Sequence, residues 1–373
     1  MKKNKIILIG PAYPYRGGIA DFSERLAHEF QQEGDEVELV TFTLQYPSFL
    51  FPGKTQSATD LAISRRISSV NPVSWLRTAR YICGRQPDLV IFAYWMAFMA
   101  PAFGFIASRL HRKGIRCVGL MHNMVPHEQS ILDKLFAPYF VRQMDGFSAL
   151  SRSVLADIDR FDKKGKPKTF CPHPLYDNFG PQVTREEAVG HLSLDEATRY
   201  ILFFGLIRDY KGLDLLMEAF AASGLAKQNV RLLVAGEFYS GEERYMALEQ
   251  SLGLQGAIVW DKRFIPNDEV KHYFAAADIV AQPYRTATQS GVTQIAYHFE
   301  RPMLVTKVGG LAEIVPDGKA GYVVAPEKEA IADALNDFFA NHREATFTEG
   351  TRSEKCKYAW SNMTKALKMK NEE

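Results

Sequence analysis

A strand, a short loop and a helix recur along this chain, and that alternation limits the folds it can adopt. The clearest copy starts with the apolar run from Tyr200 to Leu206, which contains Gly205. A helix follows in which Leu213, Leu216 and Phe220 share one face. Strands that alternate with amphipathic helices predict parallel sheets covered by helices on both sides. The sequence therefore predicts an α/β fold.

Further runs of strand length occur in both halves of the chain. In the first half, strands are predicted at 5–10, 36–41, 88–94, 116–121, 146–150 and 169–171. Six strands are expected in the second half, where 278–283 and 301–306 flank a helix at 291–299. Because 373 residues are many for one core, two domains are predicted. The first domain is predicted to contain residues 1–178 and a terminal helix at 354–373. The second is predicted to contain residues 179–353.

The four cysteines, Cys83, Cys117, Cys171 and Cys356, are scattered without paired spacing. This pattern favours reduced thiols in a cytoplasmic protein over a disulfide or zinc framework. The opening residues Met1-Lys-Lys-Asn-Lys5 lead directly into a strand, so no secretory signal is expected. The run at 89–107 is apolar, but Pro101 and Gly104 interrupt it, and it is interpreted as a buried strand rather than a membrane span.

Charge is distributed unevenly between the halves. Residues 1–180 hold 23 basic and 16 acidic residues, a net +7, while 181–373 carry a net −5. Arginines from Arg65 to Arg85 surround Trp75, and an aromatic loop at 46–51 precedes them. Basic amphipathic segments are typical of proteins that contact anionic membrane surfaces. A solvated basic face is the alternative, and no nucleic-acid module is evident.

Two cations, Arg208 and Lys211, lie three residues apart in a loop that ends at Gly212. The positive end of the next helix and these charges suit an anion. Ordinary surface cations are the alternative. The other strand ends nearby carry small or polar residues, and ligands bind at the carboxyl ends of strands in open parallel sheets. A cradle for a nucleotide diphosphate is therefore predicted.

Three motifs occur in order here: strand-Gly-x-x-Arg-x-x-Lys-Gly, then Ala-x-x-Asp-x-x-x-x-Pro, then Arg-Pro-Met-x-Val-Thr-x-x-Gly-Gly-x-x-Glu-x-Val. This set resembles the donor domain of glycosyltransferase family 4. The resemblance implies the GT-B fold, two Rossmann-like domains facing across a cleft, with a C-terminal helix that crosses back to the first. The family's Glu-x₇-Glu segment departs here, because its two positions hold Ala287 and Ile295.

The resemblance also implies a site. The catalytic residues would be His122, Arg208 and Lys211. Donor contacts are expected from Gly17, Gly18, Gly205, Glu237, Gln289, Ser290, Gly291, Val292 and Glu313. No cofactor and no metal is expected, because the two cations can meet the charge of the diphosphate. Family members usually retain the anomeric configuration, and retention is expected here.

The expected function is transfer of a sugar from a nucleotide-sugar to a hydroxyl acceptor, in particular a lipid-linked glycan or glycolipid of the cell envelope. The expected location is the cytoplasm, with peripheral contact at the inner face of the membrane. A dehydrogenase is disfavoured because Gly-x-Gly-x-x-Gly is absent. A GT-B nucleotide-sugar epimerase and a non-catalytic nucleotide-sugar-binding protein remain alternatives.

Overall fold

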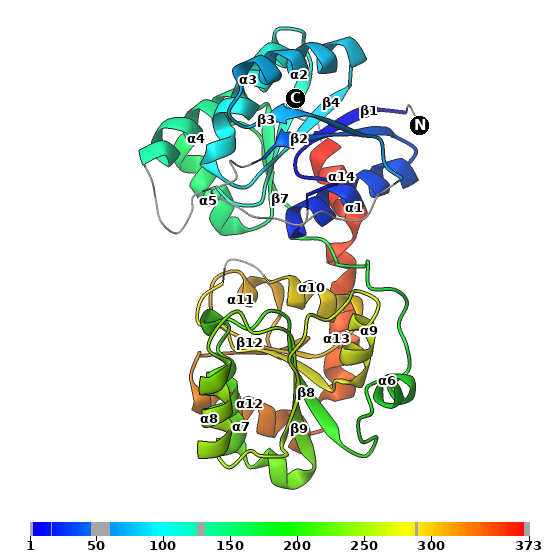
Figure 1. The fold of residues 1–373 in the computed structure, drawn as a ribbon, viewed down its shortest axis with the longest axis vertical. Coiled ribbons are helices and arrows are strands. Elements are labelled where there is room, and N and C mark those ends of the chain that lie inside the picture. The colour runs from blue at the N-terminus through cyan, green and yellow to red at the C-terminus, as the bar shows by residue number, and fades with distance from the viewer. Residues whose placement is uncertain (1–2, 16, 46–59, 125–130, 288–289, 369–373) are drawn as a thin grey trace. The chain divides into compact units, whose positions relative to one another are not determined.

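The computed structural model describes residues 3–15, 17–45, 60–124, 131–287 and 290–368. The chain forms two compact units (Figure 1). Unit 1 contains Met1–His173 and Trp360–Glu373, and unit 2 contains Pro174–Ala359. The first boundary lies before residue 179 because the segment after His173 already packs on unit 2. There the Leu175 N–H donates to the Tyr358 carbonyl, and Phe179 is buried in the unit 2 core.

A seven-stranded parallel sheet forms the centre of unit 1, in the order β3-β2-β1-β4-β5-β6-β7. In register, Ile7 on β1 lies between Glu38 of β2 and Val90 of β4. The strands are β1 (Lys5–Ile9), β2 (Glu36–Leu44), β3 (Ile63–Ser68), β4 (Leu89–Tyr94), β5 (Arg116–Met121), β6 (Gly146–Ala149) and β7 (Lys168–Phe170). Every residue of β4 is buried, as expected of a parallel strand with helices on both faces.

Helices cover both faces of this sheet. They are α1 (Gly18–Gln32), α2 (Pro72–Arg85), α3 (Ala100–His111), α4 (Ile131–Gln143), α5 (Arg152–Phe161) and α14 (Trp360–Lys368), with a 3₁₀ turn, η1, at Ala97–Met99. One apolar core lies under α2, α3 and α4, and a second lies under α1 and α14. The amphipathic face of α1 buries Phe22, Leu26 and Phe30, because apolar residues recur at helical spacing.

Strand β3 was missed by the sequence analysis, which treated 65–85 as one basic amphipathic segment. The structure divides it into β3 and α2. Arg65 and Arg66 are exposed on β3, the edge strand of the sheet, and only Ile67 of the strand is buried. Charged residues on an edge strand discourage pairing with other chains. They also interrupt the apolar alternation by which strands are recognised.

Unit 2 contains the six strands expected, in one parallel sheet of order β10-β9-β8-β11-β12-β13. They are β8 (Arg199–Phe204), β9 (Val230–Ala235), β10 (Ile258–Asp261), β11 (Ile279–Gln282), β12 (Met303–Thr306) and β13 (Gly321–Val324). The helices are α6 (Arg185–His191), α7 (Leu213–Ser223), α8 (Glu242–Ser251), α9 (Val270–Ala276), α10 (Gly291–His298), α11 (Leu311–Ile314), α12 (Lys328–Ala340) and α13 (Glu344–Lys355), with 3₁₀ turns η2 (Asp209–Lys211), η3 (Leu225–Gln228) and η4 (Cys356–Tyr358). Except for β7, both sheets have the order of a doubly wound Rossmann-like fold.

The C-terminal segment differs from the single helix predicted from residue 354. Helix α13 ends at Lys355, the turn η4 follows, and Ala359 is extended before α14 begins. Contacts within unit 2 hold this end: the Tyr358 hydroxyl donates to the Ile314 carbonyl, and Lys319 pairs with Glu354. Trp360, the first residue of α14, packs in unit 1 with its ring centre 4.9 Å from that of Phe22.

None of the described helices has both the length and the apolar character needed to cross a membrane. The apolar run at 89–107 begins with the buried strand expected, β4, and continues through η1 into the first part of α3.

Candidate active site

A cavity of about 310 Å³ opens at the carboxyl ends of β8 and β11 in unit 2. These two strands are neighbours at the point where the strand order reverses, which is where doubly wound folds bind ligands. The cavity brings together five of the residues predicted from sequence: Gly205, Lys211, Ser290, Gly291 and Val292.

The loop from β8 to α7 has a shape that requires glycine. Gly205 and Gly212 have φ angles of 89° and 68°, in the region that favours glycine. A Cβ on Gly212 would also lie 2.1 Å from the Pro283 carbonyl oxygen. Helix α7 therefore begins at Leu213, after the turn η2, and the loop lies directly against the end of β11.

Arg285, in the loop that follows β11, forms hydrogen bonds to the segment between β8 and α7 and to the start of α7. Its guanidinium donates two hydrogen bonds to the Asp214 carboxylate, at 2.7 and 3.0 Å. Its backbone N–H donates to the Tyr210 carbonyl at 2.7 Å. Bidentate pairs of this kind restrict orientation as well as distance. The two loops that line the cavity are thus held in one arrangement.

Lys211 is the main positive charge of the cavity. Its side chain is buried, and among the described residues its Nζ has no hydrogen-bond acceptor and no carboxylate partner. Burial, reinforced by the nearby charge of Arg208, lowers the pKa of Lys211 to about 8. The Nζ atom lies 5.8 Å from the centre of the Tyr284 ring. A buried ammonium in this situation is stabilised when an anion binds beside it.

Arg208 lies at the other end of the same turn and does not line the cavity. Its guanidinium stacks over the Tyr239 ring, 4.3 Å from the ring centre, and Tyr239 is 67% exposed. Arg208 is therefore a surface cation next to the cavity, and its charge is close enough to affect Lys211.

The N-terminus of α10 forms the opposite wall. Ser290 precedes the helix, and its hydroxyl lies 3.3 Å from the Tyr284 hydroxyl. A Cβ on Gly291 would lie 3.0 Å from the Tyr176 ring, so glycine leaves room for this aromatic wall. Backbone N–H groups in the first turn of a helix lack partners within the helix and can bind an anion.

The remaining predicted donor residues of unit 2 are not brought to this cavity. Glu237 and Glu313 are exposed and do not line it. Gln289 lies outside the described residues. Of the positions where the family carries glutamate, Ile295 lines the cavity and Ala287 packs on the apolar core. The described lining of the cavity therefore contains no carboxylate.

Sequence reasoning missed the aromatic lining, which includes Tyr176, Phe179, Phe204, Tyr210 and Tyr284. Tyr284 was recognisable in principle, because it directly follows a predicted strand that ends at Pro283. Tyr176 and Phe179 lie on either side of the domain boundary predicted at 178/179. Only the folded chain shows that this segment packs on unit 2.

In unit 1, His122 follows β5 at the carboxyl edge of the sheet. Its ring packs edge-on against Phe22, with ring centres 4.8 Å apart. The Nε2 atom is buried and has no hydrogen-bond partner among the described residues. Burial, with a smaller contribution from His173, lowers the pKa of His122 to about 3. The imidazole is therefore neutral at pH 7 and can bind a hydroxyl but not supply a positive charge.

Gly17 and Gly18 lie at the start of α1, also at this edge of the unit 1 sheet, and both are exposed. Gly17 has a φ of 127°, so the turn into α1 depends on glycine.

Two family models match the chain. "Glycosyl transferases group 1" matches residues 198–341, and "Glycosyl transferase 4-like domain" matches residues 17–167. Together they cover most of both units.

Curated relatives match at lower coverage. D-inositol 3-phosphate glycosyltransferase of Corynebacterium urealyticum is 28% identical over 57% of this chain and 53% of its own length. Lipopolysaccharide 1,2-N-acetylglucosaminetransferase of Salmonella typhimurium is 26% identical over 55% of each. The matched part of this chain thus spans about half the length of these relatives.

Solved structures match over nearly the whole chain. Sucrose-phosphate synthase from Thermosynechococcus elongatus has a TM-score of 0.68 at 18% identity, covering 98% of this chain and 97% of its own. Anabaena Alr3699/HepE in complex with UDP has a TM-score of 0.74 at 15% identity, covering 97% and 98%. At these identities the likeness shows a shared two-domain α/β fold.

Proposed function

We propose that this chain, which belongs to glycosyltransferase family 4 and has the GT-B fold, transfers a sugar from a nucleotide-diphosphate sugar to a hydroxyl acceptor. One observation carries the proposal: Lys211 is a buried ammonium without a carboxylate partner in the described residues, at the strand ends where this fold binds ligands. A diphosphate beside Lys211 would supply the missing negative charge.

In the proposed reaction, the bond between the anomeric carbon and the diphosphate oxygen breaks. A bond forms from that carbon to the acceptor oxygen, and the acceptor hydroxyl loses its proton. Negative charge grows on the departing diphosphate as its bond breaks. Lys211 and the first turn of α10 are placed to stabilise that charge, and such preorganised donors contribute most where charge develops. Arg208, at the rim, would add a second positive charge.

His122 is assigned to the sugar or the acceptor, as a neutral hydrogen-bonding group. Its buried Nε2 is available for a hydroxyl, and burial lowers the pKa of the imidazole, which favours the neutral form. Gly17 and Gly18 at the start of α1 are assigned to the donor phosphates, where backbone N–H groups at a helix N-terminus bind anions. Glu237, Gln289 and Glu313 remain predicted donor contacts.

We further propose that transfer needs no divalent metal and no cofactor, since cationic side chains offset the diphosphate charge. The donor class is supported by the Anabaena neighbour, whose structures contain UDP and UDP-glucose. Retention of the anomeric configuration is proposed from the family. The aromatic lining that replaces the usual carboxylates would contact the donor sugar through ring faces and the hydroxyls of Tyr284 and Ser290.

The proposed acceptor is a lipid-linked glycan or glycolipid of the cell envelope, reached by peripheral binding at the cytoplasmic face of the membrane. Residues 61–113 contain eight lysine and arginine residues and one carboxylate, Asp88. In this region Val70 and Val73 are 51% and 54% exposed near the start of α2, and Arg77 and Arg80 on that helix are exposed. The predicted aromatic loop at 46–51 lies outside the described residues. The lipopolysaccharide-modifying relative supports this acceptor class.

The donor is tested first, by a thermal-shift panel of uridine, guanosine and adenosine diphosphates and their sugars. A ligand that binds the native state raises the melting temperature with its occupancy. Turnover is then followed with the stabilising nucleotide-sugar, with and without a glycolipid acceptor and with and without EDTA. Transfer that survives EDTA supports the proposal. Turnover without acceptor would indicate an epimerase, and binding without turnover a binding protein.

Membrane contact is tested by flotation with anionic and neutral liposomes. Binding to anionic liposomes that weakens with salt is expected, since each basic residue near the surface contributes about 1 kcal/mol. The double variant Arg77→Ser with Arg80→Ser should reduce it, while Lys227→Ser with Lys262→Ser in unit 2 serves as a control of equal charge loss. Absence of binding at low salt would reject the membrane contact and leave the transfer proposal intact.

A further inference from the structure

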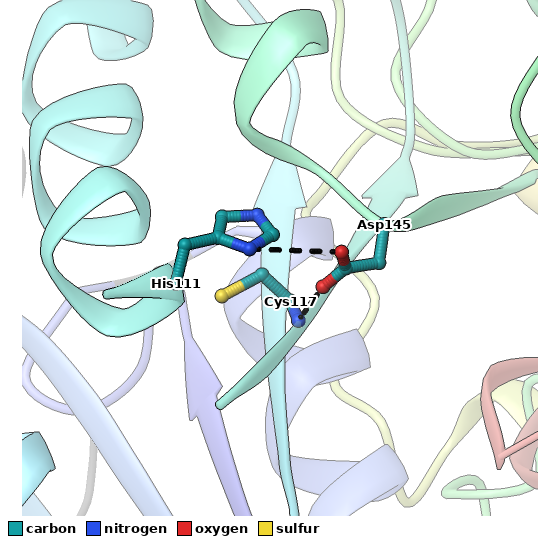
Figure 2. Close-up of side chains that lie close together, drawn as sticks. All are labelled: His111, Cys117 and Asp145. Carbon is teal, nitrogen blue, oxygen red and sulfur yellow. Dashed lines mark hydrogen bonds and ion pairs between the residues drawn. The ribbon is translucent and has the colours of Figure 1, made fainter. Parts of the chain in front are cut away.

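Three potential metal ligands meet at the edge of unit 1 opposite His122: His111, Cys117 and Asp145 (Figure 2). They come from three elements, the last residue of α3, the second residue of β5 and the residue before β6. Their ligand atoms all lie within 4.8 Å of one another, and the His111 and Asp145 side chains point toward each other.

The hydrogen bonds around His111 determine which ring nitrogen is free. Its Nε2 contacts the Gln143 carbonyl, which can only accept, so Nε2 carries the proton. In the neutral ring, Nδ1 then presents a lone pair to Asp145 Oδ1, 3.6 Å away. Two acceptors facing each other can be bridged by a proton, a water molecule or a cation. A histidine that donates one N–H to a carbonyl while its other nitrogen binds a metal is a common arrangement.

The Asp145 carboxylate is also oriented for this role. Its Oδ2 accepts the backbone N–H of Cys117 at 2.7 Å, which leaves Oδ1 directed at His111. Two ligands on one tetrahedral zinc ion, each about 2.1 Å from it, are roughly 3.4 Å apart, close to the 3.6 Å observed between Nδ1 and Oδ1.

Cys117 supplies the softest ligand. Its side chain is fully buried, and burial together with the Asp145 charge raises the pKa of the thiol. Thiolate sulfur is a preferred ligand of ions of the zinc class. One thiolate, one carboxylate and one neutral imidazole would together neutralise a divalent ion.

Solvent can reach the cluster. The His111 and Asp145 side chains are 34% and 38% exposed, and both line a cavity of about 370 Å³. Lys166 also lines it, but its ammonium is held by the carbonyls of Val141, Arg142 and Met144 at the end of α4. Water from the cavity can complete the coordination of a metal ion.

We propose that His111 Nδ1, Cys117 Sγ and Asp145 Oδ1 bind one divalent ion of the zinc class, which ties α3 to the starts of β5 and β6. Cys117 and His122 are five residues apart on extended chain, roughly 16 Å. The ion would therefore stabilise unit 1 without taking part in the proposed transfer. Binding converts the thiol to a thiolate and releases one proton.

Metal titration of the tag-free, chelator-treated full chain tests this site. One zinc ion should bind per chain with release of about one proton. Cobalt(II) should give a thiolate-to-metal charge-transfer band. At about 100 times the dissociation constant, zinc should raise the melting temperature of unit 1 by roughly 5–10 °C. Nucleotide binding in unit 2 should not change.

Cys117→Ser and Asp145→Asn should each weaken zinc binding at least tenfold, and Cys117→Ser should abolish the cobalt band. Cys171→Ser is the matched control, because Cys171 is a buried thiol and the described part of the chain places no such ligand group around it. If Cys117→Ser does not fold, the same cobalt titration is made on a chain that carries Cys83→Ser and Cys356→Ser and keeps Cys117. No cobalt–thiolate band in that chain, or an unchanged band in Cys117→Ser, would overturn the proposal. An imidazolium–carboxylate ion pair alone would then explain the cluster.

Discussion

The first strand-to-helix loops of the two units occupy equivalent places in sheets of the same winding, yet their polar groups differ. In unit 2, the loop from β8 to α7 carries Arg208 and the buried Lys211. In unit 1, the backbone N–H of Tyr13 in the loop from β1 to α1 is taken by the Glu24 carboxylate at 2.7 Å. The shared topology places both loops at a ligand-binding edge, and in the described residues one presents a buried ammonium and the other an N–H group already held by a carboxylate.

The largest effect is expected from Lys211→Ala in the unit 2 loop. Arg208→Ala removes the exposed cation of the same loop. Loss of a charge that stabilises the leaving group should lower kcat/KM by roughly 10²-fold or more. The effect should be larger for Lys211, because it is buried and Arg208 is not. Lys262→Ala, which removes a surface cation paired with Glu242, should have little effect. Near-normal kcat/KM in both loop variants would reject the assigned donor site.

His122→Ala tests the contribution of unit 1. Loss of one hydrogen-bonding group at the reacting sugar should lower kcat by roughly 10²-fold. Nucleoside-diphosphate affinity, measured by calorimetry, should remain within about twofold because the phosphate groups are assigned mainly to unit 2. His173→Ala controls for lost packing, since His173 lies against the same Phe22 ring at 4.9 Å. An equal loss of nucleotide affinity in His122→Ala would indicate a disturbed fold instead.

The pH dependence of nucleotide binding sharpens the comparison. A bound diphosphate favours the protonated form of Lys211, whose pKa in the free protein is about 8. Affinity should therefore be highest below pH 8 and fall by up to tenfold per pH unit above it. In Lys211→Arg the decline should disappear, because arginine stays protonated. Because the pKa of Lys211 is lower in the folded chain than in the unfolded chain, burial of this ammonium reduces the free energy of unfolding below pH 8. The reduction disappears as the pH rises from 8 toward the ordinary pKa of lysine.

The smallest effect is expected at Glu24 in the unit 1 loop. Burial raises the pKa of its carboxyl, while the Tyr13 N–H opposes that shift. Glu24→Gln keeps an acceptor for this N–H and should change the free energy of unfolding by less than about 1 kcal/mol. Glu24→Ala leaves the N–H without its acceptor and should cost about 1–2 kcal/mol in urea unfolding. A large gain in nucleotide affinity in Glu24→Gln would mean that unit 1 holds more of the phosphate charge than proposed.

The sequence by itself determined the parallel α/β architecture, because helical and strand periodicity depend on which residues are apolar. It also located the cation loop, whose residues are close in sequence, and the end of β5 that carries His122. Strand β3 was not predicted, because its exposed charged residues interrupt the apolar alternation of a strand. The boundary between the units was predicted a few residues too late, because nothing in the local sequence of 174–179 shows that this segment packs on unit 2.

Only the tertiary structure decided what surrounds each charge. Lys211 is buried by packing between loops about 75 residues apart in sequence, and this burial lowers its pKa. The pair between Arg285 and Asp214, which are 71 residues apart, holds these loops together. Cys117 shows the same limit, because the sequence does not indicate which side chains surround its thiol. The fold brings His111 and Asp145, which are 34 residues apart in the chain, to within 3.6 Å of each other beside that thiol. Spacing along a chain reports local geometry, whereas ligand sets and desolvation depend on contacts that only folding creates.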